Sequence, residues 1–172
     1  MGHHICAIIG KQESANIDII KKYQLAAAFE NNYVIIILKM DSIFYWSDQL
    51  NLSFDSESED IDWACPLVFF FAQEIGFEEY AIIQTNYFGG MGSQCASLYR
   101  NGNCILKEVD INETLKALGV TVQTKTDEFE EINLDDYRAS EYYYWTENNL
   151  AEDQDNMIPG KVPPDYKYRS FS

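Results

Sequence analysis

The tripeptide Asn101-Gly102-Asn103 separates two segments with the composition of β-strands, residues 94–100 and 104–109. An Asn-Gly pair in this position is a strong hairpin signal, because both residues tolerate the positive φ angles of a tight turn. Such a turn can join only antiparallel strands. A third strand pattern, at residues 80–87, precedes these two, so the sequence predicts an antiparallel meander.

Helical patterns lie on both sides of the meander. Apolar residues at helical spacing predict helices over residues 15–30, 62–75 and 110–118. Pro66 suits the first turn of the second helix, because the first helical residues have no intrahelical acceptor for their N–H groups. Gly76 and Gly119 suit the positions at which the second and third helices end.

Further strand patterns occupy residues 5–10, 33–40, 43–52 and 120–124. Helices and strands follow one another without a regular strand–helix–strand repeat. The predicted class is therefore α+β: a mixed or antiparallel sheet, with the Asn-Gly hairpin meander, packed by two or three helices. A single domain is expected over residues 1–146, followed at 147–172 by an extended segment that is acidic and then contains Pro and Tyr.

Two segments have the composition of a core. Residues 33–40 (YVIIILKM) form a nearly unbroken β-branched run, typical of a central strand that is covered on both faces. The helix at 62–75 carries apolar residues around almost its whole circumference, which is typical of a buried helix. Neither segment can face water, so we expect the helix to lie against the sheet with the ring of Phe70 buried.

The charge balance limits the partners that the chain can bind. The 172 residues include 28 acidic and 12 basic side chains, a formal net charge of −16. Nucleic acids and anionic lipid surfaces repel a field of this sign, so neither is expected as a partner, whereas a basic protein is favoured. With 47% hydrophobic and 15% aromatic residues, the chain is too apolar for a disordered acidic segment.

Cysteine usage and the apolar runs favour a cytoplasmic location. The four cysteines, Cys6, Cys65, Cys95 and Cys104, form no C-x-x-C pair and stand in apolar runs, as expected of reduced core thiols. The N-terminus lacks the charged and apolar regions of a secretory signal. No run reaches 18 apolar residues, so no membrane span is expected.

Catalytic and metal-binding patterns are weak. His3 and His4 are the only histidines, and neighbours on a strand point to opposite faces, so they make a poor catalytic or metal-binding pair. Cys6 could reach His4 along one strand face, but a buried structural thiol is the simpler interpretation. The acids of residues 55–62 lack the central glycine of an EF-hand. Neither a cofactor nor a metal ion is expected.

The most distinctive local string lies between two predicted strands. It contains Tyr87, Phe88, Gly89, Gly90, Gly92 and Gln94. A phosphate-binding loop would be followed by a helix N-terminus, whereas here a strand follows. We interpret the glycines as permitting positive φ angles in an irregular strand connection, which could also contact a partner.

Two acidic runs, at residues 55–62 and 127–136, and a third acidic stretch near 147–155 hold about half of the acids. Like charges packed so densely repel one another and oppose folding. We therefore expect the electrostatic field of these acids to have a function. Aromatic residues beside the second run could anchor an interface or close the core. The residues predicted to bind a partner are Asp127, Glu128, Glu130, Glu131, Asp135, Asp136, Tyr143 and Trp145.

The pattern Y-F-G-G-x-G-x-Q at residues 87–94, followed by an apolar strand and an N-G turn, resembles small acidic bacterial proteins encoded beside polymorphic or contact-dependent toxins. The resemblance covers residues 80–106. It implies an immunity protein, a non-enzymatic role in which the chain binds a cognate toxin domain and masks its active site. The acidic, tyrosine-rich C-terminal section departs from that pattern.

Three functional hypotheses follow. The first is an immunity protein that neutralises a basic toxin, such as a nuclease, through its acids and aromatic anchors. The second is a small enzyme or ligand-binding domain that uses the loop at residues 89–92 with Tyr87 and Gln94. The third is a structural subunit of an oligomer, for which a stable symmetric assembly is expected.

Overall fold

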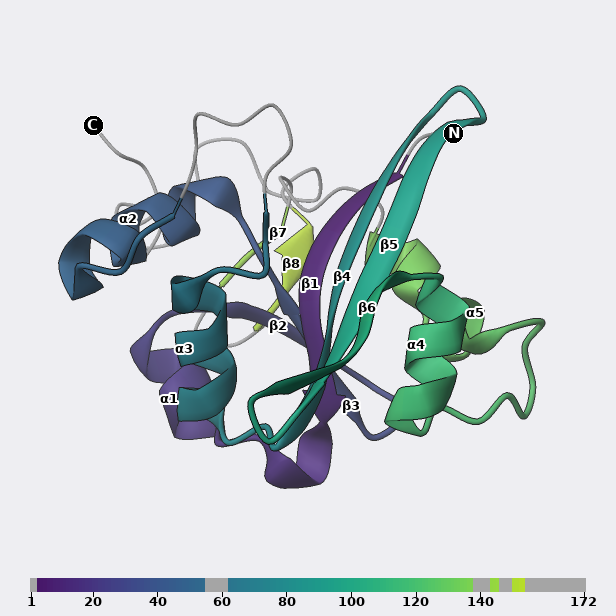
Figure 1. The fold of residues 1–172 in the computed structure, drawn as a ribbon, viewed down its shortest axis with the longest axis horizontal. Coiled ribbons are helices and arrows are strands. Elements are labelled where there is room, and N and C mark those ends of the chain that lie inside the picture. The colour runs from purple at the N-terminus through teal and green to yellow at the C-terminus, as the bar shows by residue number, and fades with distance from the viewer. Residues whose placement is uncertain (1–2, 55–61, 138–142, 146–149, 154–172) are drawn as a thin grey trace.

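The computed structural model describes residues 3–54, 62–137, 143–145 and 150–153 (Figure 1). The chain forms one α+β domain around a six-stranded sheet in the order β2-β3-β1-β4-β5-β6, in which all neighbouring strands are antiparallel. The strands of this sheet are β1 (His3–Lys11), β2 (Ala26–Glu30), β3 (Tyr33–Ile37), β4 (Glu79–Phe88), β5 (Met91–Arg100) and β6 (Asn103–Val109).

Helices cover both faces of the sheet, which confirms the predicted fold class. The helices are α1 (Ile17–Lys22), α2 (Met40–Leu50), α3 (Pro66–Ile75), α4 (Ile111–Leu118) and α5 (Glu128–Glu131), with 3₁₀ turns η1 (Gln12–Ser14) and η2 (Leu134–Tyr137). Figure 1 shows α1 and α3 on one side of the strands and α4 and α5 on the other. Along β1, Cys6 and Ile8 pack toward α3, and Ile5, Ala7 and Ile9 pack toward α4, as strand alternation requires.

Helix α3 lies against the sheet as predicted, although it starts at Pro66 rather than at residue 62. Gly76 ends it with a φ of 100°. The prediction that the helix is buried all round was wrong, because Gln73 and Glu74 are exposed. Phe71 is fully buried, whereas Phe70, which was expected to be buried, is only partly so and packs against the ring of Tyr23.

Two-residue turns join neighbouring strands of the sheet at three places, residues 31–32, 89–90 and 101–102. The predicted turn at Asn101-Gly102 is confirmed, with φ angles of 50° and 79°. The Asn31-Asn32 pair joins β2 to β3 in the same way, with φ angles of 46° and 68°. Two successive positive φ angles match the twist of antiparallel strands.

The helix predicted over residues 15–30 is therefore only partly correct. Asn16 caps α1, which ends at Lys22, and residues 26–30 form β2 instead. Alanine has a strong helix propensity, but the small side chains of Ala26 and Ala28 fit against one core and Ala27 against the other. Pairing with β3 through the Asn31-Asn32 turn overrides the local preference.

The strand predicted over residues 43–52 was also wrong, because this segment belongs to α2. Ile43, Trp46 and Leu50 follow helical spacing and pack on the α3 side of the core. The indole N–H of Trp46 donates to the carbonyl of Tyr23 at 2.9 Å. Residues 33–37 form the predicted buried strand, which lies second from the edge of the sheet rather than at its centre.

Residues 120–124, predicted as a strand, form an irregular loop after α4. The prediction for α4 itself is confirmed: Asp110 caps it by accepting from the N–H groups of Asn112 and Glu113, and Gly119 ends it. The predicted core thiols are buried at Cys6 and Cys65, but Cys95 is partly exposed and Cys104 is exposed. None of the four cysteines forms a disulfide bond.

The described part of the C-terminal segment lies on the domain. Strands β7 (Tyr143–Tyr144) and β8 (Glu152–Asp153) form a small second sheet. The carbonyl of Leu150 accepts from the N–H of Ala27 at 2.6 Å, which covers part of the β2 edge. Among the described residues, no helix combines the length and the apolar character that crossing a membrane requires.

Candidate functional site

The tip of the β4–β5 hairpin presents two large apolar side chains to solvent. Phe88 and Met91 face each other across the Gly89-Gly90 turn, and 86% and 80% of their surfaces are exposed. Figure 1 shows this hairpin extending beyond the helices that cover the rest of the sheet. An exposed apolar pair at the end of a projecting hairpin is unusual in a folded domain and is typical of an interaction site.

The glycines of the hairpin are required by its geometry, as the sequence predicted. Gly89 and Gly90 have φ angles of 61° and 80°, the same turn geometry as at Asn101-Gly102. At Gly92 a Cβ atom would lie 2.0 Å from the carbonyl oxygen of Asn86, so only glycine fits there. Around Gly89 and Gly90 no atom lies within 4 Å of an added Cβ, which leaves the turn open to solvent.

The hairpin face that carries Phe88 and Met91 is uncharged. No Asp, Glu, Lys or Arg occurs between residues 80 and 99, in a chain that is 23% charged. Below the tip, the cross-strand pairs Asn86–Ser93 and Gln84–Cys95 project to the same face, because successive pairs alternate between faces.

This face continues into a groove of about 700 Å³ beside α3. Trp63, Phe69 and Tyr99 line its apolar end. Asp62, Lys107 and Glu108 also line the groove and are exposed. The uncharged hairpin face thus runs from a groove that carries some charge to the Phe88–Met91 tip.

The other predicted loop residues lie on the opposite face. Tyr87 pairs with His3 of β1. Gln94 donates to the carboxylate of Asp110, the N-cap of α4, at 3.3 Å. The hairpin is thereby tied to the helix layer that carries the acidic segment.

Two of the predicted acidic site residues have internal roles. Asp127 caps α5 by accepting from the N–H of Glu130 at 2.9 Å. Glu131 is buried, and its Oε2 accepts from the N–H groups of Gln123, Thr124 and Lys125 at 3.1–3.2 Å. These hydrogen bonds lower the pKa of the Glu131 carboxyl. The prediction that Glu131 faces a partner was wrong, because its charge is used to hold the loop before α5.

The predicted aromatic anchors are buried as well. Tyr143 and Trp145 are only 9% and 8% exposed. The Tyr143 hydroxyl donates to the carbonyl of Asp136 at 2.6 Å, and its ring packs on that of Tyr137. Tyr143 belongs to the α4 side of the core, and because both side chains are buried neither is a free anchor in this conformation.

The remaining acids of the segment face solvent. Glu130, Asp135 and Asp136 are exposed, and Glu128 is partly exposed. The neighbouring helix adds two exposed acids that the sequence prediction did not include, Asp110 and Glu113. The ion pair between Arg100 and Glu79 joins β5 to β4 and lies outside this group of acids.

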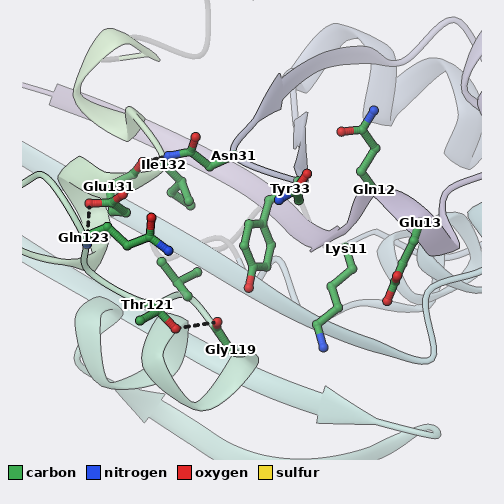
Figure 2. A pocket seen from close by; sticks show the side chains of 12 residues that line it. Lys11, Gln12, Glu13, Asn31, Tyr33, Gly119, Thr121, Gln123, Glu131 and Ile132 are labelled. Atoms are coloured by element: carbon green, nitrogen blue, oxygen red, sulfur yellow. Dashed lines mark hydrogen bonds between the residues drawn. The ribbon is translucent and has the colours of Figure 1, made fainter.

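A cavity of about 770 Å³ lies at the end of the sheet where α4 finishes (Figure 2). Its lining residues come from the end of β1, the β2–β3 turn, the loop after α4 and the end of α5. Sequence reasoning missed it, because these four segments meet only in the folded chain. Figure 2 shows the Lys11 ammonium and the Tyr33 hydroxyl both directed toward the Gly119 end of α4.

Among the described residues, no group of three or more His, Cys, Asp and Glu side chains is arranged to hold a metal ion. His4 is exposed on β1, two residues from buried Cys6. Comparisons of the chain with protein-family models, with characterised proteins and with solved structures give no match. Function therefore has to be inferred from the geometry and charge of the chain itself.

Proposed function

We propose that this chain is a non-enzymatic binding protein that docks on a basic partner protein through the tip of the β4–β5 hairpin. The observation that carries the proposal is the exposure of Phe88 and Met91, at 86% and 80%. Burying either side chain in a partner's pocket contributes about 1.5–3 kcal/mol. Exposed apolar side chains that lie next to each other on a folded domain mark interaction sites more often than isolated ones do.

The negative charge of the chain favours a basic partner. A net charge of −16, with exposed acids on the α4–α5 face, attracts a basic surface and raises the rate of encounter. The hydrogen bond between Gln94 and Asp110 places that face beside the base of the hairpin. Acids would thus steer the partner, and the uncharged tip would hold it.

The resemblance of residues 80–106 to toxin-associated immunity proteins supplies the class of partner. In this proposal the partner is a toxin domain, such as a nuclease, with a positive active-site cleft. The hairpin enters or covers that cleft, and masking prevents the toxin from reaching its substrate. The chain itself performs no chemistry.

The ligand-binding alternative at residues 89–92 has less support. Its glycines lie at an open tip, and neither hollow described above is lined by them. The structural-subunit alternative predicts that Phe88 and Met91 pair with a second copy of the chain. Light scattering of the purified protein separates these cases, because self-association through the tip would be lost when both residues become serine.

The resemblance implies a toxin gene beside the gene of this chain, and co-expression with the C-terminal domain of such a toxin tests the proposal. The wild-type chain is expected to protect the host and to co-purify with that domain. The double variant Phe88→Ser/Met91→Ser is expected to lose both properties while keeping its unfolding midpoint. Ile105→Ser, on exposed strand β6, is the matched control and should protect fully. Full protection by the double variant would refute the proposed docking site.

A further inference from the structure

We propose that the groove beside α3 binds an arginine-containing peptide segment of the basic partner, with the arginine at Asp62 and Glu108 and a peptide carbonyl on the indole N–H of Trp63. The inference rests on the proposed function, because it names the part of the basic partner that lies next to the hairpin tip. It stands on three observations: a groove of sufficient size, a buried donor without an acceptor among its lining residues, and two carboxylates that act on one point of the groove.

The groove has the size and the position of a peptide-binding site. Its volume of about 700 Å³ falls within the range of roughly 300–1,000 Å³ that is typical of ligand sites. Residues 62–64 and Phe69 of α3 form one wall, and the rest of the lining comes from β4, β5 and β6. The uncharged hairpin face runs from this groove to the Phe88–Met91 tip, so a partner held at the tip is within reach of the groove.

Trp63 supplies a hydrogen-bond donor. The residue is 3% exposed, and its Nε1 atom is buried without a hydrogen-bond partner among the described residues. Buried donors are normally paired, as in Trp46 on the same side of the sheet, whose indole N–H donates to the carbonyl of Tyr23 at 2.9 Å. Because Trp63 lines the groove, a peptide carbonyl bound there is the acceptor that this donor lacks.

Asp62 and Glu108 supply negative charge. Asp62 precedes α3 and Glu108 belongs to β6, so the two carboxylates reach the groove from different elements. Burial raises the pKa of the Cys95 thiol, which also lines the groove, and the charges of Glu108 and Asp62 raise it further. Both charges therefore act on the same point of the groove.

A bulge in β6 brings Glu108 to the groove. Neighbouring residues of a regular strand point to opposite faces, yet Lys107 and Glu108 both line the groove. The pairing of β6 with β5 shifts register here, Glu108 has a φ of 52°, and its N–H donates to the hydroxyl of Ser97 at 3.0 Å. A bulge re-aims the side chain that it carries, and this one adds a carboxylate to the groove.

The aromatic lining favours arginine over lysine. Trp63, Phe69 and Tyr99 line the apolar end of the groove, and the ring centroids of Phe69 and Tyr99 lie 5.0 Å apart. A guanidinium group stacks on aromatic rings and binds carboxylates through a planar fork of N–H donors, whereas an ammonium group is strongly hydrated. Lys107 opposes a cation, but the two acids outnumber it among the described lining residues.

An NMR titration of the full chain tests the groove without the partner. The probe is the tripeptide Gly-Arg-Gly with an N-acetyl group and a C-terminal amide. The matched controls carry citrulline, which is neutral and has nearly the same shape, or lysine in place of arginine. We expect saturable shifts at Trp63, Cys95 and Ser97, and the indole N–H resonance of Trp63 should move as it gains an acceptor. The citrulline peptide should bind about tenfold more weakly and the lysine peptide about threefold more weakly.

Charge variants test the role of the acids. Asp62→Asn, which keeps the acceptor for the N–H of Ala64, and Glu108→Gln are each expected to weaken binding of the arginine peptide about threefold. Lys107→Gln should tighten binding, because it removes the opposing charge. Glu74→Gln, at an exposed position of α3, is the control and should leave the affinity unchanged.

A second pair of variants tests the donor. Trp63→Phe removes the indole N–H and should weaken binding about tenfold. Trp145→Phe is the matched control, because the Trp145 indole is also buried without a described partner but does not line the groove, and it should leave the affinity unchanged. The shift of the Trp63 indole resonance in the wild-type chain tests the same contact without a substitution in the core.

Three results would overturn the proposal. The first is the absence of saturable shifts with the arginine peptide. The second is binding of the citrulline or the lysine peptide with the affinity of the arginine peptide. The third is a Trp63 indole resonance that does not move at saturation. These results bear on the groove alone, because the isolated chain is titrated and the tip variant Phe88→Ser/Met91→Ser should bind the peptide as the wild type does.

Discussion

The Oε2 atom of Glu131 accepts a hydrogen bond of 3.1 Å from the backbone N–H of Gln123. Thr124 and Lys125 donate to the same oxygen, so one buried carboxylate holds three successive N–H groups of the loop between α4 and α5. Part of the acidic segment is therefore structural, and only the part that faces solvent can act on a partner.

Glu131→Gln should lower the melting temperature by several degrees at neutral pH, because a neutral amide is a weaker acceptor for these N–H groups. Glu74→Gln, at an exposed position of α3, is the control and should leave it unchanged. The native pKa of Glu131 is lowered, so its contribution is complete above the unfolded pKa of glutamate, about 4.3, and is lost as pH falls through the native value. The difference between wild type and variant should therefore shrink below about pH 4. A difference that is constant from pH 7 to about pH 2 would contradict this role.

Phe71→Ala should cost about 3–5 kcal/mol of unfolding free energy, because the ring is fully buried against the sheet. Phe70→Ala should cost less than about 2 kcal/mol, since that ring is already partly exposed. Urea denaturation of both variants measures the difference. Equal losses of unfolding free energy in the two variants would contradict the orientation of α3, in which Phe71 and not Phe70 is fully buried against the sheet.

Gly92→Ala should destabilise the hairpin more than Gly90→Ala. At residue 92 the new methyl group would overlap backbone atoms of Asn86 and Tyr87, and these atoms are fixed by the sheet. At residue 90 the only cost is the left-handed backbone, about 1–2 kcal/mol. The order of the two urea midpoints checks the turn geometry, and the reverse order would contradict it.

Reversal of the four solvent-facing acids Glu128, Glu130, Asp135 and Asp136 to Lys should lower the association rate with the proposed toxin partner by about tenfold or more. Raising the salt concentration should slow association of the wild-type chain for the same reason, since charges are screened beyond about 8 Å at physiological ionic strength. Stopped-flow association at two salt concentrations measures both effects. Unchanged association rates in a folded variant would show that these four acids form an ordinary solvated surface with no role in binding.

Local signals were enough to predict the elements whose ends carry strong capping or turn residues. Asn101-Gly102 predicted the β5–β6 hairpin, and Gly119 predicted the end of α4. The fold class followed from the same residues, because a tight Asn-Gly turn requires antiparallel strands.

The elements that were wrongly predicted depend on partners distant in the sequence. Residues 26–30 form a strand because β3 pairs with them, and residues 40–50 form a helix that packs on the core and whose Trp46 donates to the carbonyl of Tyr23. Helical spacing at Ile43, Trp46 and Leu50 was present in the sequence and could have corrected the second error.

The candidate sites were only partly predictable, for a similar reason. The glycine string located the hairpin tip, but exposure of Phe88 depends on how far the hairpin extends past the helices. Acid clustering could not distinguish Glu131, which binds three N–H groups, from exposed Glu130. The groove beside α3 has no local signal, because α3 and the strands that line it meet only in the folded chain.

The dissociation rate of the complex with the proposed toxin partner tests the docking of the hairpin tip most directly. Surface plasmon resonance with Phe88→Ser and with Met91→Ser should show dissociation about tenfold to a hundredfold faster than for the wild type, with association little changed, because apolar anchors set the lifetime of a complex. Ile105→Ser should dissociate at the wild-type rate. Wild-type dissociation rates for both tip variants, in chains that unfold at the wild-type urea midpoint, would contradict the account.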